Sequence, residues 1–375
     1  MEARGYFGAL GYQMPVEINP SEYLLDLINT DFVRSGYDSK ARMEHIHRAW
    51  ECSQQSLAIK EEIQTVLSHA DARQKHDSST SKSLNQGQNA FTIPLVLLHR
   101  SWIKSYRDVV AYGIRIFMYL GLAILMGTVF LRLSTDQASI QPFINAIFFS
   151  SAFMSFMAVA YVPSFLEDRA TFAKERANGL CGPLAFTISN FLIGLPYLFL
   201  IALLFSVVEY WLSNFRPNAN AFWTWVLWLF LDLVAAESLI VLVSSIFPVF
   251  VVALSVAAFA NGLWMCVDGF LVPMGTLNVF WKYVFHYIDY QAYVFQGMLV
   301  NEFEQRIFDC AGSQQEGYQC MYQSDLAPKG QIRGTAVLQA FNYHGGLEGE
   351  WVGIMIAIIL GYRVLGWLVL YLKKT

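Results

Sequence analysis

The stretch that decides the fold runs from residue 221 to residue 272 and reads AFWTWVLWLFLDLVAAESLIVLVSSIFPVFVVALSVAAFANGLWMCVDGFLV. As one α-helix it would be about 78 Å long, whereas the apolar core of a bilayer is about 30 Å thick. The stretch must therefore fold back on itself, and Pro248 is the natural break because proline interrupts a helix. It predicts two spans, residues 221–247 and 249–272.

Apolar runs of similar length lie on both sides of this stretch. A helix that crosses a bilayer needs about 20 apolar residues, and the further candidates are 110–131, 142–166, 183–208 and 351–371. Of the 375 residues, 55% are hydrophobic and 14% are charged, against about 25% charged in an ordinary soluble domain. We therefore predict an all-α polytopic membrane protein with six transmembrane helices.

The positions of lysine and arginine predict the orientation of these spans. An even number of spans places both termini on the same side, and the positive charges beside the spans gather there: Arg100, Lys104, Arg107, Arg169, Lys174, Arg176, Lys373 and Lys374. The short loops of the opposite side hold Arg132 and Arg216. Because positively charged loops stay in the cytosol, both termini are predicted to be cytosolic, and we expect the plasma membrane.

Two further segments lie outside the predicted spans, one before the first span and one between the fifth and the sixth. Residues 1–91 are rich in charge and have no apolar run long enough to cross a bilayer, so we predict a cytosolic segment. Within it, 41–67 favours helix, and 68–90, rich in Ser, Gln, Asp and Asn, is typical of a linker. Residues 273–350 are aromatic at first and then polar, which predicts a re-entrant and extracellular loop whose irregular backbone is buried in protein or lines a cavity.

The segment 92–109, just before the first span, has two contrasting faces. At helical spacing, the apolar face holds Leu95, Leu98, Trp102, Tyr106 and Val109, and the basic face holds Arg100, Lys104 and Arg107. We predict an interfacial connecting helix whose basic face lies toward lipid headgroups. A helix packed against protein is the alternative.

The sequence lacks the motifs of several kinds of functional site. The chain contains no Gly-Lys dipeptide, which excludes GxxxxGK[ST], the motif that cradles phosphates, from these residues. His45 and His47 lie near Cys52, but no fourth ligand has suitable spacing, so we predict no metal site and no catalytic residue. With a net charge of −4 and no strongly basic segment, the chain also offers nucleic acid no electrostatic footprint.

A charged segment, FLEDRATFAKERANGLCGP (165–183), separates the second and third spans. Gly179 follows its charges at a position where a helix can end. Two interpretations remain open on the residues alone. A short helix here can dock on another protein and transmit its movement to the spans, or the charges are set by membrane topology, with side chains that reach to the interface.

Charged residues inside the predicted spans are costly and call for a functional explanation. Asp232 and Glu237 lie five residues apart, about 140° around a helix, so they cannot both face one partner directly. Glu237 is the better candidate for a structural ion pair or for a polar contact near a transport path, and we favour the ion pair. Arg115 and Arg363 lie nearer the cytosolic ends, where we expect them to extend toward the interface.

Three segments resemble one family. FLEDRATFAKERANGLCGPLAFTISNFLIGLPYLF (165–199) is similar to the coupling region of the G subfamily of ABC transporters, the white-brown type. YFGALGYQMPVEINPSEYLLDLI (6–28) resembles the tail that follows the ATP-binding domain of that family. GFLVPMGTLNVFWKYVFHYIDYQAYVFQGMLVNEF (269–303) resembles its fifth span, re-entrant helices and Asn-Glu-Phe element. The matches follow in order over essentially the whole chain, which starts where the family's ATP-binding domain normally ends.

The resemblance implies roles for particular residues. A coupling helix that contacts the ATPase would carry Glu167, Arg169, Phe172, Glu175, Arg176 and Gly179. A substrate cavity between the second and fifth spans of two protomers would be lined by Phe149, Phe153, Phe156, Asn261 and Met265, a set that suits flat hydrophobic molecules. Phe270 and Leu271 match an apolar plug above that cavity. For the cavity and the plug, ordinary packing against lipid or helices is the alternative.

The resemblance also bears on two cysteines. Cys310 and Cys320 fall in the predicted outer loop, an oxidising setting in which disulfides persist, and the family often has a disulfide there. We expect these two residues to pair. Free thiols and a bond across a dimer are the alternatives.

The resemblance implies that residues 110–375 are an ABC-2 type transmembrane domain of an ATP-driven exporter of lipids, sterols or xenobiotics. It would work among membrane lipids as a homodimer, or as a heterodimer with another half-transporter. ATP and magnesium would be bound by a separate or missing nucleotide-binding domain, and no cofactor by this chain. The alternative is a degenerate, non-transporting family member that regulates or scaffolds a partner. An ion-coupled transporter would need charges that converge at mid-membrane, and the sequence shows no inverted repeat to support it.

Overall fold

The computed structural model describes residues 2–15, 17–28, 39–76, 92–107, 109–313 and 317–373. The chain divides into two compact units, Met1–Gln88 and Asn89–Thr375. The helices of the first unit are α1 (Glu2–Ala9), α2 (Pro20–Ile28), α3 (Ser39–Glu51) and α4 (Gln54–His76).

Helix covers most of the stretch predicted to be helical in the first unit, with one break. The 41–67 segment is divided between α3 and α4, and the hydroxyl of Ser53 accepts the Ser56 N–H at 3.1 Å, which caps α4 at its N-terminus. The helix α4 continues to His76, so the first part of the predicted linker 68–90 is helical, and 77–90 lies outside the described residues.

The second unit is a helix bundle. Among the described residues, six helical stretches are long and apolar enough to cross a membrane, and they confirm the predicted all-α fold with six spans. They consist of α6 (Val109–Val129), α7 (Ile140–Met157) with α8 (Val162–Ala177), α9 (Pro183–Leu212), α10 (Ala219–Ile246), α11 (Phe250–Val267) and α15 (Glu348–Leu372). The chain is thus an integral, multi-pass membrane protein.

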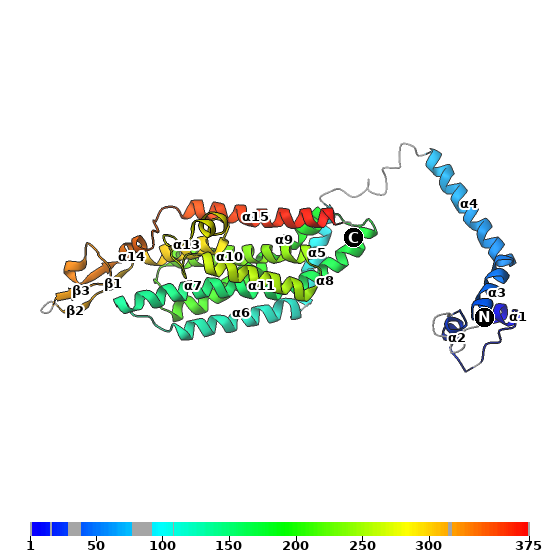
Figure 1. The fold of residues 1–375 in the computed structure, drawn as a ribbon, viewed down its shortest axis with the longest axis horizontal. Coiled ribbons are helices and arrows are strands. Elements are labelled where there is room, and N and C mark those ends of the chain that lie inside the picture. The colour runs from blue at the N-terminus through cyan, green and yellow to red at the C-terminus, as the bar shows by residue number, and fades with distance from the viewer. Residues whose placement is uncertain are drawn as a thin grey trace. The chain divides into compact units, whose positions relative to one another are not determined.

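Helix α10 lies at the centre of this bundle. It is buried along almost its whole length and packs against α7, α9, α11 and α15. The amphipathic helix α5 (Thr92–Arg107) packs across α9, next to the start of α6. Figure 1 shows α5, α8 and the end of α15 together at one end of the bundle. We call this the charged end.

The second span and the charged segment form one nearly continuous helical rod. Helix α7 passes through a single 3₁₀ turn, η2 (Ala158–Tyr161), directly into α8 (Figure 1). Pro163 lies in the first turn of α8, where its missing N–H leaves no intrahelical hydrogen bond unmade. The span was expected to end at residue 166, with a short charged helix beyond it, whereas helical structure here continues without a loop to Ala177. The charged segment is therefore joined to the second span by a helical turn and not by a loop.

The opposite end of the bundle carries the strands (Figure 1). Helix α11 ends at Val267, five residues before the predicted limit, and is followed by α12 (Val279–Trp281), the π-helical turn η3 (Lys282–His286) and the buried α13 (Tyr290–Phe303). Two short antiparallel pairs follow, β1 (Ile307–Asp309) with β4 (Gln331–Arg333) and β2 (Ala311–Ser313) with β3 (Gly317–Gln319). The turn η4 (Ala327–Lys329) precedes β4, and α14 (Gly334–Ala340) follows it. A disulfide joins Cys310 to Cys320.

The Asn-Glu-Phe element fastens α13 to the first turn of α10 and to the loop before it. The Asn301 amide donates to the Ala221 carbonyl at 2.9 Å, and the Glu302 carboxylate accepts the Arg216 N–H at 3.1 Å. Glu302 also forms an ion pair with Arg306, and both side chains are buried. Burial raises the pKa of the Glu302 carboxyl, and the positive charge of Arg306 partly offsets that increase. This anchor holds the strand end against the spans.

Replacement of Glu302 tests the anchor. Glu302→Ala leaves the buried guanidinium of Arg306 without its counter-charge, which we expect to cost about 3 kcal/mol of stability. The measurement is the apparent melting temperature of the purified protein in detergent. Glu304→Ala, two residues further on and exposed, is the control and should leave that temperature unchanged. Equal melting temperatures for the two variants would contradict the anchor.

Candidate functional site

Two ion pairs hold α8 against α5. Arg100 pairs with Glu175, and the Lys104 Nζ lies 2.7 Å from the Asp168 Oδ1. Residues 100 and 104 are one turn apart on α5, and residues 168 and 175 are two turns apart on α8, so both pairs lie along one edge of contact. All four side chains are partly exposed, and ion pairs in such positions are each worth about 0–1 kcal/mol.

These ion pairs correct the predicted orientation of α5. The basic face was expected to lie toward lipid headgroups, but Arg100 and Lys104 turn toward the carboxylates of α8. On the other face, the apolar side chains of Leu95, Trp102 and Tyr106 are each more than half exposed, and Arg107 is exposed as well. The alternative, a helix packed against protein, fits Arg100 and Lys104 of the basic face. The sequence pattern located both faces correctly but did not reveal the carboxylates that attract the basic one.

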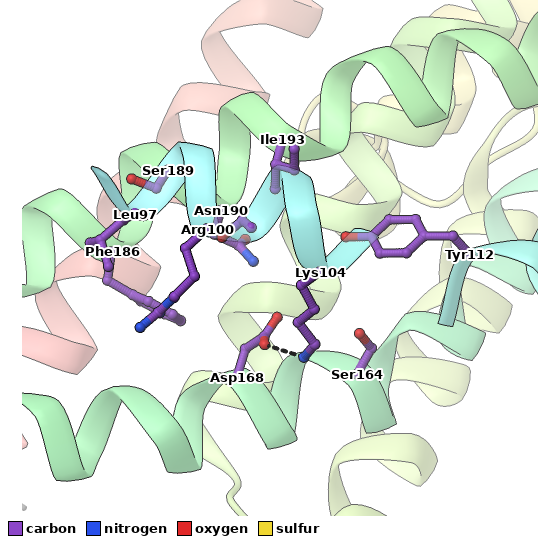
Figure 2. A pocket seen from close by; sticks show the side chains of 11 residues that line it. Leu97, Arg100, Lys104, Tyr112, Ser164, Asp168, Phe186, Ser189, Asn190 and Ile193 are labelled. Carbon is purple, nitrogen blue, oxygen red and sulfur yellow. Dashed lines mark hydrogen bonds and ion pairs between the residues drawn. The ribbon is translucent and has the colours of Figure 1, made fainter. Parts of the chain in front are cut away.

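A small cavity lies behind these ion pairs, among α5, α6, α8 and α9. Its volume is about 30 Å³, room for roughly one or two water molecules. It is lined by Leu97, Arg100, Ser101, Lys104, Tyr112, Ser164, Asp168, Phe186, Ser189, Asn190 and Ile193. Figure 2 shows Lys104 reaching down from α5 to Asp168 on α8 at one side of this space. A site of this size does not hold cargo, so its polar lining belongs to the contact between helices.

The Pro-Tyr pair of α9 also holds α5. Pro196 lies inside α9, where it removes one backbone hydrogen bond. The hydroxyls of Tyr197 and Ser105 lie 2.6 Å apart, and the Tyr197 ring packs on Tyr112 with centroids 4.4 Å apart. Helix α5 is therefore fixed to α9 as well as to α8.

The end of α8 has the geometry of a Schellman motif. Gly179 has a left-handed φ of +70°, and its N–H donates to the Arg176 carbonyl at 2.9 Å. The Leu180 N–H donates to the Glu175 carbonyl at 2.9 Å. Glycine suits this position because a side chain is disfavoured at positive φ. The helix thus ends where the sequence predicts it can.

The other residues assigned to the coupling helix lie in different surroundings. Phe172 is buried and stacks on Phe186, with ring centroids 4.5 Å apart. Glu167 is exposed on α8. Arg169 and Arg176 direct their guanidinium groups to backbone carbonyls at the ends of α10 and α15. Contact of any of them with an ATPase stays a prediction.

A buried ion pair lies within the spans. The Arg115 Nη2 is 2.9 Å from the Glu237 Oε2, and the Arg363 Nη2 is 4.0 Å from the Glu237 Oε1. Arg363 also donates to the Ser238 hydroxyl at 2.9 Å and to the Asn190 side-chain carbonyl at 3.1 Å. The favoured ion pair of Glu237 is thus present.

The two arginines do not extend to the interface, which corrects that expectation. Arg115 is 5% exposed and Arg363 is 6% exposed. Both lie within reach of Glu237, and burial is less costly for a charge that is paired and hydrogen-bonded than for an isolated one. A Cβ on Gly194 would lie 2.8 Å from the Glu237 Oε1, so glycine at this position of α9 leaves room for the carboxylate.

Two further buried acids pair with serine hydroxyls of α7. The Ser155 hydroxyl lies 2.7 and 2.8 Å from the two oxygens of Asp232, and the Ser150 hydroxyl donates to Glu209. Asp232 and Glu237 face different partners, as their angular separation predicts. The sequence analysis did not predict Glu209 or the two serines. Glu209 could have been found, because it is an acid within an apolar run.

The aromatic residues assigned to a cavity lie along one side of α7. Phe149 and Phe153 stack with centroids 5.7 Å apart, and Phe153 and Phe156 are 37% and 41% exposed. Met265 of α11 is partly exposed. Asn261 is fully buried and accepts the Tyr290 hydroxyl at 2.8 Å. The structure therefore presents the three phenylalanines and Met265 at a surface and turns Asn261 inward.

The residues assigned to a plug follow directly after α11. Gly269 has a φ of +104°, which turns the chain sharply. Phe270 then stacks on Phe148, with centroids 4.0 Å apart and rings inclined by 15°, while Leu271 is 55% exposed. Phe270 thus packs on the aromatic face of α7, next to Phe149.

Replacement of Glu237 tests the buried ion pair. Glu237→Gln leaves two buried guanidinium groups without a counter-charge, and we expect a loss of about 3 kcal/mol of stability. Asp232→Asn is the matched control, because the amide retains a hydrogen-bond acceptor for Ser155 and no cation loses its partner. Thermal unfolding in lipid nanodiscs compares the two. A larger loss for Asp232→Asn would overturn this account.

The match to known proteins covers these helices. Residues 95–303 match the family model described as ABC-2 type transporter, which is more than half of the chain. This range includes α7, α8, the ion pairs with α5 and the Arg115–Glu237 pair. The helices α14 and α15 lie outside it.

Similar proteins include plant and fungal transporters. ABC transporter G family member 1 of Petunia hybrida is 30% identical over 304 residues, 80% of this chain and 48% of that protein. ABC transporter G family member 11 of Arabidopsis thaliana is 27% identical over 326 residues, 83% and 46% respectively. ABC transporter CDR4 of Candida albicans is 23% identical over 325 residues, 83% and 22% respectively.

The chain spans about half the length of the two plant relatives. The family match contains the charged segment and the spans up to α11, and the 375 residues contain no phosphate-binding Gly-Lys motif. The chain is therefore a membrane domain of the G type and belongs to the ABC-2 type transporter family.

Proposed function

We propose that this chain is the membrane domain of an ATP-driven exporter that moves hydrophobic or amphipathic molecules across a membrane. The observation that carries the proposal is the rod formed by α7, η2 and α8. One part of this rod is a membrane span and the other is a charged helix at the end of the bundle. A movement imposed on α8 reaches the second span without passing through a flexible loop.

The residues of this chain receive and transmit the movement. A nucleotide-binding domain would bind ATP with magnesium and press on α8, with both termini of this chain in the cytosol. The Arg100–Glu175 and Lys104–Asp168 pairs are partly exposed and individually weak. Such contacts exchange partners at little cost, which suits a helix that shifts between two positions. The buried Glu237 pair, by contrast, keeps the spans in register.

The side chains on the surface of α7 indicate the chemical class of the cargo. Phe149, Phe153 and Phe156 present flat apolar area, and Met265 adds a side chain that adapts its shape. Together with the same surface of a second protomer, these residues would form a site for flat hydrophobic molecules such as sterols or xenobiotics. Phe270, which stacks on Phe148, would close the space above them. The second protomer is a copy of this chain or another half-transporter, and the plasma membrane is the expected location.

Reconstitution tests the function. The tagged chain is purified with its bound partners and placed in liposomes, with a fluorescent sterol and a fluorescent amphipathic dye as probes. We expect ATP-dependent accumulation of at least one probe, abolished by vanadate. An assembly that contains an ATPase but moves neither probe would instead fit a regulatory or scaffold role.

A charge exchange tests the contact between α5 and α8. Glu175→Arg sets two guanidinium groups against each other and should reduce ATP-dependent transport at least tenfold. Arg100→Glu in the same chain restores opposite charges and should recover most of that loss. Arg107→Gln changes an exposed arginine of α5 and should leave transport unchanged. Full transport by the single Glu175→Arg variant would rule out a role for this contact.

A truncation tests the cargo surface. Phe153→Ala removes an exposed ring from α7, and we expect the half-saturating concentration of the fluorescent sterol to rise about fivefold or more. Phe199→Ala removes a similarly exposed ring from α9, 42% against 37% for Phe153, and serves as the control. Equal effects of the two substitutions would show that the α7 surface does not select the cargo.

A further inference from the structure

The backbone carbonyls at the carboxyl ends of α10 and α15 need hydrogen-bond donors from outside their own helices. The last four carbonyls of an α-helix have no N–H donor within the helix. They also form the negative end of the helix dipole, which favours a nearby cation. Helix α10 ends at Ile246 and α15 ends at Leu372, both at the charged end of the bundle.

One guanidinium group binds the end of α15. The Arg176 Nη1 donates to the Leu370 carbonyl at 2.5 Å and to the Lys373 carbonyl at 3.1 Å. The Arg176 Nη2 donates to the Tyr371 carbonyl at 3.1 Å. Three carbonyls of the last turn and its cap thus bind a single side chain of α8.

Two cations bind the end of α10. The Arg169 Nη1 donates to the Ser244 carbonyl at 3.0 Å. The Lys373 Nζ donates to the Ile246 carbonyl at 2.5 Å and lies 3.5 Å from the Ser245 carbonyl. Helix α8 therefore holds the ends of both spans, and the residue after α15 joins the two ends to each other.

The sequence of α8 explains how one helix makes these contacts. Asp168 and Glu175 are seven residues apart, as are Arg169 and Arg176, and seven residues are close to two full turns. The acids form one stripe along the helix, toward α5. The arginines form the neighbouring stripe, toward the ends of α10 and α15.

The same seven-residue spacing fills the other sides of α8. Phe165 and Phe172 are buried and both contact the ring of Phe186. Glu167 and Lys174 form an exposed stripe. The helix thus has one core side, two sides bound to neighbouring helices and one exposed side.

We propose that Arg169 and Arg176 are positioning residues that tie α8 to the carboxyl ends of the fourth and last spans. With Lys373 joining those ends, a displacement of α8 moves all three helices together. The proposal rests on the proposed function, in which α8 transmits movement. It assigns the two arginines to the inside of the membrane domain, rather than to contact with an ATPase.

We call the contacts of Arg169 and Arg176 with these carbonyls the tie. The tie is not needed for α10 and α15 to fold. The two helices pack side by side, and Arg363 bonds α15 to Ser238 in the middle of α10. Loss of Arg176 therefore frees one terminal turn and leaves the packing of the bundle intact. The effect of such a loss is expected in transmitted movement, with little effect on folding.

The first experiment measures transport and ATP hydrolysis of the same assembly. Arg176→Ala should retain hydrolysis within twofold of the unchanged protein, while transport of the fluorescent probe falls at least fivefold. Arg176→Lys should recover part of the transport, because an ammonium group can bind these carbonyls as Lys373 binds those of α10. Arg107→Gln is the control arginine. Full transport by Arg176→Ala, or a parallel loss of hydrolysis and transport, would overturn the proposal.

The second experiment reads the tie without transport. A spin label at Leu372, with Cys52 and Cys266 changed to Ser, reports the mobility of the last turn of α15. We expect Arg176→Ala to increase this mobility and Arg107→Gln to leave it unchanged. Unchanged mobility in Arg176→Ala would refute the tie, even in an assembly that transports. If the protein with Arg176 intact does not transport, that result counts against the proposed function alone. The spin label still reports whether Arg176 holds the end of α15.

Discussion

Hydrocarbon offers no hydrogen-bond partner, and this constraint shapes the surroundings of the buried charges in the bundle. Each buried acid within the spans bonds a side chain of a neighbouring helix: Glu237 with Arg115, Asp232 with Ser155 and Glu209 with Ser150. An unpaired charge in that setting would be costly, so these pairs fix which helix faces lie together. The carbonyls at the helix ends obey the same requirement, and cations of α8 and Lys373 satisfy part of it.

The bundle therefore has contacts of two strengths. Pairs at its centre are buried and hold the spans in register, whereas the pairs between α5 and α8 are partly exposed and weak. Helix α8 connects the two regions, because it continues the second span and also carries the partly exposed charges that contact α5.

Much of the fold was predictable from local pattern. Six apolar runs, the break at Pro248 and the amphipathic segment before the first span appear in the structure because helix length and apolar periodicity are properties of consecutive residues. The helices of the second and fifth spans end at other residues than the apolar composition predicted. Apolar composition ends near residue 166, but α8 continues because its charged side chains find partners on α5, α10 and α15, which lie far away in the sequence.

The sequence by itself determined the class of the protein, the six spans and the position of the charged segment, since each depends on the composition of one stretch of chain. The tertiary structure alone decided the partners: that Arg100 meets Glu175, that Arg115 and Arg363 converge on Glu237, and that Arg176 binds the end of α15. A charge shows that a partner is needed, but not which one. The choice depends on how helices pack across 75 to 194 residues of intervening sequence.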